Sequence, residues 1–173
     1  GGAYWAVCSD REGEPIAIWN IGMEKKVDIH LLAANIVHEM FHAFQLEKGE
    51  KRFPQDLVTL NYPVNIENLT LKHHENLVLM KAYEEKDCLN KSQLLNEFFS
   101  IRKQREGIIG EYTNCEYLTE TAEGMAEYVG SLALKEISPE KFLHRMEEYV
   151  RLLSEPKEML LNTRKLCYYS GTM

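Results

Sequence analysis

Hydrophobic residues recur with a helical period along most of this chain, after a first part that is rich in aromatic and β-branched residues. Residues 3–8 and 15–21 are two such runs on either side of a polar segment, which predicts an antiparallel β-hairpin. From residue 29 to 48, apolar side chains recur at i, i+3 and i+4 positions, which predicts a long, largely buried helix. Asp28 is a suitable N-cap for this helix, and Gly49 is a suitable end.

Amphipathic patterns predict helices over residues 70–86 and 92–109, and helix-start residues predict two more over residues 119–135 and 138–153. We expect the first two to form a helical hairpin. Thr119 and Ser138 are N-cap residues for the last two, and Pro156 begins one more helix. Residues 52–68 contain two prolines and little periodicity, which predicts a loop. The expected fold class is therefore α+β and predominantly α, in a single domain over residues 1–173.

Composition and charge restrict the partners of this domain. The chain has 173 residues, 45% of them hydrophobic, which is enough for one domain with a sizeable core. A formal charge of −7 and a pI near 5.4 argue against nucleic acid or an anionic membrane as the main partner. No apolar run is long enough to span a membrane, and no basic-then-apolar signal opens the chain. A cytoplasmic location is slightly favoured. Because the sequence does not begin with methionine, an export signal upstream of it is the alternative.

The four cysteines do not point to a metal or redox site. Cys8, Cys88, Cys115 and Cys167 show no C-x-x-C spacing, which argues against structural zinc and thioredoxin-like chemistry. We expect free buried thiols, with two disulfides as the alternative in an exported protein.

The strongest candidate for chemistry lies in the predicted helix over residues 29–48. His38 and His42 are one helical turn apart, so both imidazoles can reach one ion. Glu39 is adjacent to the first histidine, where a carboxylate can take a proton from a metal-activated water. This is the H-E-x-x-H pattern of zinc sites, and it predicts one bound Zn²⁺.

A catalytic zinc ion needs a third protein ligand, and the predicted helix over residues 119–135 offers one. Glu123 is followed by Gly124, which has no side chain and lets this helix pack closely against another. Glu127 is one turn further along and could accept the Nδ1–H of a ligating imidazole. Glu120 is the competing ligand, one turn before Glu123 on the same predicted face, and the glycine favours Glu123.

The two motifs together resemble the gluzincin clan of zinc peptidases, in particular aminopeptidase N and glycyl aminopeptidases. In that clan, H-E-x-x-H is followed downstream by E-G-x-A-x-Y, and the residues Glu123-Gly124-Met125-Ala126-Glu127-Tyr128 match this second pattern. The resemblance implies a zincin-like catalytic domain in which Glu123 is the third zinc ligand. The stretch between the two motifs is much longer here than in aminopeptidase N, so we expect it to fold as an insertion.

A short C-terminal segment extends the resemblance. Cys167-Tyr168-Tyr169-Ser170-Gly171 resembles the Y-x-x-G segment that carries the catalytic tyrosine of aminopeptidase N relatives. The resemblance selects Tyr168 as a donor to the oxyanion of the tetrahedral intermediate, or Tyr169 if the register differs by one. The alternative is that both tyrosines only pack a helix end.

Together these residues predict a zinc-dependent hydrolase of a peptide bond or of a smaller amide, with Glu39 as general base. The expected partner is a peptide or protein substrate, whose free amine Glu120 could hold if that residue faces the cleft. The alternative function is a non-catalytic, zincin-like binding module. An intact Glu39 argues for the enzyme.

Two other polar groups are expected to be solvated helix surface. His73 and His74 are adjacent, so on a helix they point about 100° apart and cannot share an ion. Arg102, Lys103 and Arg105 form a basic cluster that is typical of a solvated face. If that cluster faced the cleft, it could bind a substrate carboxylate.

Overall fold

The computed structural model describes residues 5–9, 13–19, 27–54, 61–157 and 163–173. The outer ends of the predicted hairpin, at residues 3–4 and 20–21, lie outside the described residues. So do residues 55–60 of the predicted loop and residues 158–162, where the helix beginning at Pro156 would continue.

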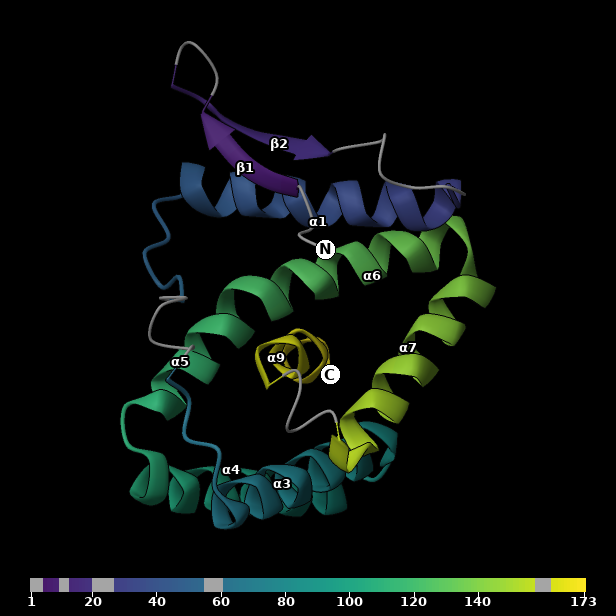
Figure 1. Ribbon diagram of the computed structural model, residues 1–173. Coiled ribbons are helices and arrows are strands. Elements are labelled where there is room, and N and C mark those ends of the chain that lie inside the picture. The colour runs from purple at the N-terminus through teal and green to yellow at the C-terminus, as the bar shows by residue number, and fades with distance from the viewer. Residues whose placement is uncertain (1–4, 10–12, 20–26, 55–60, 158–162) are drawn as a thin grey trace.

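The described part of the chain is predominantly helical, with one small sheet at its start. Strands β1 (Trp5–Ser9) and β2 (Pro15–Trp19) pair antiparallel, with Val7 opposite Ala17. The predicted hairpin pairing is thus confirmed within the described residues. The sheet lies against helix α1 (Ile29–Glu47), on the side away from the rest of the molecule (Figure 1).

Helix α1 begins and ends where its capping residues predict. The Asp28 side chain accepts hydrogen bonds from the backbone N–H groups of His30 and Leu31, at 3.0 and 3.3 Å. At the other end, Gly49 has a φ of +74°, a conformation that favours glycine. Lys141, on helix α7 (Pro139–Ser154), also pairs with Asp28 and thereby links the start of α1 to that helix.

Helices α3 (Ile66–Glu84) and α4 (Cys88–Ile109) pack side by side as the predicted hairpin. Each begins one turn earlier than its apolar pattern indicates. The reason is capping, because Asn65 and Asp87 accept hydrogen bonds from backbone N–H groups three residues further on, at 2.8 and 2.9 Å.

The predicted helix over residues 119–135 is longer than expected and contains a π turn. It comprises α5 (Tyr112–Thr119), the π-helical turn η2 (Glu120–Gly124) and α6 (Met125–Ile137) without interruption. The prediction that Thr119 caps a helix is therefore wrong. Its hydroxyl instead donates to the carbonyl oxygen of Cys115, one turn earlier in the same helix, at 2.8 Å.

Helix α9 (Thr163–Thr172) is the central element of the helical part. Figure 1 shows it end-on, surrounded by α6, α7 and the α3–α4 pair. Two apolar clusters form the core around it, one between α3 and α4 and one between α3, α7 and α9, and Met173 packs against both. None of the described helices is long and apolar enough to cross a membrane.

Candidate metal centre

Helix α6 approaches α1 closely at the histidine motif. A Cβ atom at Gly130 would lie 2.8 Å from the carbonyl oxygen of Ala34 and 3.4 Å from the Cβ of His38, so no side chain fits there. Gly124 also makes a close approach, as expected, but to α9 rather than to α1. A Cβ atom at Gly124 would lie 2.6 Å from the Cα of Gly171. One glycine thus sets the distance to the histidines and the other sets the distance to α9.

Three ligand atoms converge between these helices. The Nε2 atoms of His38 and His42 are 3.1 Å apart, and Oε2 of Glu123 lies 3.1 Å from His42 Nε2 and 3.6 Å from His38 Nε2. A tetrahedral ion with bonds of about 2.0–2.1 Å holds neighbouring ligand atoms about 3.3–3.4 Å apart. The three residues, which we call the metal centre, therefore have the spacing that one metal ion requires.

The far side of the His38 ring is held by Glu127. The Nδ1–H of His38 donates to Oε2 of Glu127 at 3.0 Å. The other oxygen of that carboxylate accepts hydrogen bonds from Arg145, at 3.2 Å, and from the hydroxyl of Tyr149. Because an ionised carboxylate only accepts, the hydrogen of a neutral His38 ring is on Nδ1, and Nε2 turns a lone pair toward the metal centre.

The far side of the His42 ring is held by Gln45, a residue that the sequence analysis missed. The Nδ1–H of His42 donates to Oε1 of Gln45 at 2.8 Å. The Gln45 amide nitrogen in turn donates to the carbonyl oxygens of Thr121 and Ala122 in the π turn, at 3.4 Å each. These bonds fix the amide orientation and the hydrogen on Nδ1. The signal available in the sequence was a glutamine one turn after a ligand histidine.

The convergence of acceptors at the metal centre requires a positive charge between them. Two imidazole lone pairs and a carboxylate oxygen would otherwise repel one another in a site where His38 is only 6% exposed. Without a metal, a proton takes this place. Burial lowers the pKa of His38, but hydrogen bonds to Glu123 and Glu127 outweigh it and raise that pKa to about 9.

The π turn separates the two glutamates between which the sequence left a choice. Glu123 faces the histidines, whereas the carboxylate of Glu120 accepts two hydrogen bonds from Arg102, at 2.6 and 2.8 Å, and one from Ser170, at 2.6 Å. In a regular α-helix, residues three apart share a face. The wider π turn rotates them apart, and π turns are frequent at functional sites. Glu120 is thus occupied and does not hold a substrate amine.

Beside the metal centre lies a cleft of about 210 Å³ that contains Glu39. Its lining comes from α1, α6, α7 and α9 and consists of Asn35, His38, Glu39, Glu127, Arg145, Tyr149, Lys165, Tyr168 and Tyr169. Glu39 is only 3% exposed, and burial raises its pKa, although the two histidines act in the opposite direction. A carboxyl group with a raised pKa holds a proton more readily than a solvated one, which suits it to proton transfer in a cleft.

The two C-terminal tyrosines line the same cleft but have different neighbours. The ring of Tyr168 stacks on His38, with centroids 6.1 Å apart and planes 10° apart, and its hydroxyl is hydrogen-bonded to Glu123. Burial raises the pKa of Tyr168, so the hydroxyl keeps its proton. Tyr169 stacks on Tyr149, with centroids 4.5 Å apart, and packs against the core. Of the two, Tyr168 lies at the metal centre.

The prediction of a solvated basic cluster on α4 is wrong for two of its three residues. Arg102 and Arg105 are 3% and 0% exposed, while Lys103 is exposed. The two arginines belong to a buried ion-pair network that alternates cations and carboxylates from α3, α4, α5 and η2: Lys72, Glu75, Arg102, Arg105, Glu116 and Glu120. The acidic partners are distant in sequence, so the charge pattern of α4 alone could not reveal them.

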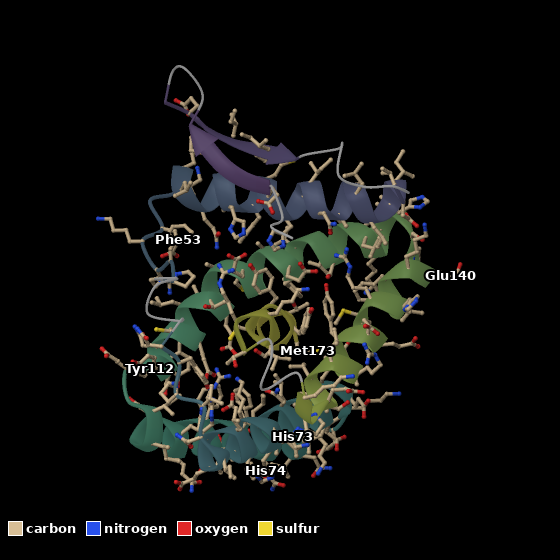
Figure 2. All side chains as sticks on the ribbon, viewed as in Figure 1. Phe53, His73, His74, Tyr112, Glu140 and Met173 are labelled. Atoms are coloured by element: carbon tan, nitrogen blue, oxygen red, sulfur yellow. The ribbon has the colours of Figure 1, made fainter. Side chains whose placement is uncertain are left out.

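The remaining candidates lie away from the metal centre. Figure 2 shows His73 and His74 on α3, at the opposite side of the molecule from α1. His74 is exposed as predicted, and His73 is half-buried. Cys115 and Cys167 are buried free thiols, whereas the free Cys88 is exposed, contrary to expectation. The side chain of Cys8 lies outside the described part of the structure.

Comparisons with models of known protein families, with curated proteins and with solved structures gave no match. The structure itself shows a mostly helical domain with a group of two histidines and one glutamate that could hold a metal ion.

Proposed function

We propose that this protein is a zinc-dependent hydrolase of a peptide bond or of a smaller amide, built on a zincin-like domain. The observation that carries the proposal is the convergence of His38, His42 and Glu123 beside a cleft that contains Glu39. The resemblance of the two motifs to gluzincin peptidases supports the same function.

Zinc is the metal that fits the ligands best. Two imidazole nitrogens and one carboxylate oxygen form the ligand set of several catalytic zinc sites, which keep a fourth position open. When bound, the ion would supply Lewis acidity that activates a water molecule and polarises a carbonyl group. Glu127 and Gln45 would hold the two imidazoles in the tautomer that binding requires.

Glu39 is proposed to move the proton during hydrolysis. As water adds to the carbonyl carbon, Glu39 accepts a proton from that water. As the carbon–nitrogen bond breaks, Glu39 delivers a proton to the leaving nitrogen, so that an acid and an amine result. The raised pKa of Glu39 supports both steps, because the carboxyl group can hold the proton between them.

Tyr168 is proposed to donate a hydrogen bond to the oxyanion that develops when water adds to the carbonyl. Its hydroxyl is protonated, lies in the cleft and is already directed at Glu123. A preorganised donor of this kind stabilises charge that forms only in the transition state.

Elemental analysis tests the metal centre. We expect one zinc per chain in the purified protein and a loss of most of it in His38→Ala and in His42→Ala. His74→Ala, a change of an exposed histidine on α3, is the matched control and should keep the metal. Equal zinc content in all four proteins would exclude this site.

A peptide-library digest then tests the reaction. The zinc-loaded parent should cut peptides or small amides, and Glu39→Gln should not. A zinc-loaded parent that binds peptides without cutting any would instead indicate the alternative function, a non-catalytic binding module.

A further inference from the structure

The carboxylates around the metal centre are already bound by cationic or hydrogen-donating groups. Glu127 is bound by His38, Arg145 and Tyr149. Glu123 faces the two imidazoles and also accepts a hydrogen bond from Arg164, at 3.3 Å. Among the described residues that line the cleft, only the Glu39 carboxylate remains, and its proposed task is proton transfer. This part of the structure therefore offers no spare acid to hold the free amine of a substrate.

Cations, in contrast, are available in the cleft. Lys165 lines it and is exposed, and among the described residues no carboxylate pairs with its ammonium group. Arg145 lines it too and is mostly buried, with an exposed side-chain fraction of 11%. The hydrogen bonds of Arg145 to Glu127 and to Asn35 use one N–H each, on Nη1 and on Nη2. A guanidinium group has five such donors, so Arg145 can make further bonds.

The cleft does not share the acidic charge of the chain as a whole. The chain as a whole carries a formal charge of −7. In the cleft, the positive charges of Arg145 and Lys165 balance the negative charges of Glu39 and Glu127. A divalent ion at the metal centre would exceed the single charge of Glu123 and make the site positive. A positive cleft on an acidic protein attracts an anionic group of a ligand.

We propose, on the basis of the proposed hydrolase function, that this cleft binds a carboxylate of the substrate through Lys165, assisted by Arg145. The substrate class is then a peptide or small amide that has a free carboxylate close to the bond that is cut. The cleft volume of about 210 Å³ is below the range of roughly 300–1,000 Å³ that is usual for drug-sized ligands. This is room for one residue-sized group, as a carboxyl-terminal residue would be.

The test compares an N-acetylated dipeptide that has a free terminal carboxylate with the same dipeptide as its terminal amide. The zinc-loaded parent should have a kcat/KM at least tenfold higher for the acid, in line with a hydrogen bond to a charged group. Lys165→Met should remove most of this preference, and Lys165→Arg should keep it. Lys103→Met, a change of an exposed lysine on α4, should leave the preference as in the parent. A parent that cuts the amide as well as the acid would overturn the proposal.

A third substrate identifies the source of the carboxylate. The dipeptide amide with a glutamate as its last residue restores the negative charge on a side chain. Cleavage as fast as that of the free acid would show that the cleft accepts any nearby carboxylate. Slow cleavage would show that it selects the chain terminus.

Binding separates this proposal from the hydrolase proposal. Zinc-loaded Glu39→Gln should bind the acid more tightly than the amide in calorimetry, whether or not the parent cuts either. If the parent cuts nothing while this binding preference holds, the hydrolase proposal fails and the carboxylate site remains. Equal binding of acid and amide would exclude the carboxylate site.

Discussion

The described part of the protein contains two buried polar clusters that differ in how their charges are compensated. In the ion-pair network, three cations alternate with three carboxylates, and the network holds no excess charge. Arg105 alone donates to Glu75, to Glu116 and to Asn68. In the metal centre, by contrast, three acceptor atoms face one another and a cleft opens beside them.

This difference separates a structural cluster from a candidate site. Burying a charge is costly unless a partner compensates it, and the ion-pair network compensates each of its charges internally. At the metal centre, Arg164 donates to Oε1 of Glu123, but the three converging atoms still need a proton or a metal ion between them. Buried acceptor atoms that converge with no donor between them are therefore a stronger indication of a ligand than burial or charge alone.

The first prediction contrasts Glu39 with Glu116, two buried glutamates whose pKa values are shifted in opposite directions. Glu39→Gln should keep zinc and lower the rate of hydrolysis about 10²–10⁴-fold, the usual contribution of a general base. Because burial raises the pKa of Glu39, removing its charge should not lower the free energy of unfolding. Turnover assays and urea unfolding of the same preparation measure both effects. An unchanged rate would remove Glu39 from the mechanism.

The second prediction concerns the ion-pair network. Glu116 accepts hydrogen bonds from Lys72 at 2.9 Å and from Tyr62 at 2.6 Å, and it also binds Arg105. Glu116→Gln would leave buried cations without their partner, and we expect it to lower the free energy of unfolding by about 3–5 kcal/mol. Denaturant unfolding measures this loss. The folded variant should still bind one zinc, so a loss of zinc in folded protein would contradict the separation of the two clusters.

The two clusters also differ in how well the sequence predicts them. His38, Glu39 and His42 are local in sequence, so helical periodicity alone places both imidazoles on one face. The ion-pair network joins α3, α4, α5 and η2, and its pairs form only in the folded chain. The local sequence around Arg102 and Arg105 therefore predicted a solvated helix surface, although both side chains are almost completely buried.

The choice between Glu120 and Glu123 as the third ligand could be predicted only in part from the sequence. Regular helical spacing puts both glutamates on one face and cannot distinguish them, whereas the π turn rotates one toward α1 and the other toward Arg102. Nothing in the local sequence predicts that turn. The starts of α3 and α4, in contrast, could have been predicted from the sequence, because Asn65 and Asp87 are common N-cap residues.

The third prediction tests whether Gln45 couples the metal centre to the π turn. Gln45→Ala should lose both the bond to His42 and those to the carbonyl groups of Thr121 and Ala122. Loss of such an outer partner lowers metal affinity about 10–100-fold in comparable sites. A competition titration with a chelator measures the affinity, and the absorption spectrum of the cobalt-loaded protein reports a change in ligand geometry. Gln104→Ala, at an exposed position of α4, is the control. Equal affinity in both variants would reduce Gln45 to a packing residue.

The last prediction is the pH dependence that the ion-pair network imposes on stability. The buried cations hold the pKa values of Glu75 and Glu116 below the ordinary value of 4.5, against the effect of burial, which raises them. A carboxylate with a lowered pKa in the folded state contributes stability above the unfolded-state value and loses it as the pH falls. The free energy of unfolding should therefore decrease below about pH 4.5, which urea unfolding at a series of pH values measures. In Glu116→Gln this decrease should be smaller, because one of the two titrating groups is gone. Glu97→Gln, a change of an exposed glutamate on α4, is the control and should show the same decrease as the parent. An equal decrease of the free energy of unfolding with falling pH in all three proteins would show that the network does not determine stability in acid.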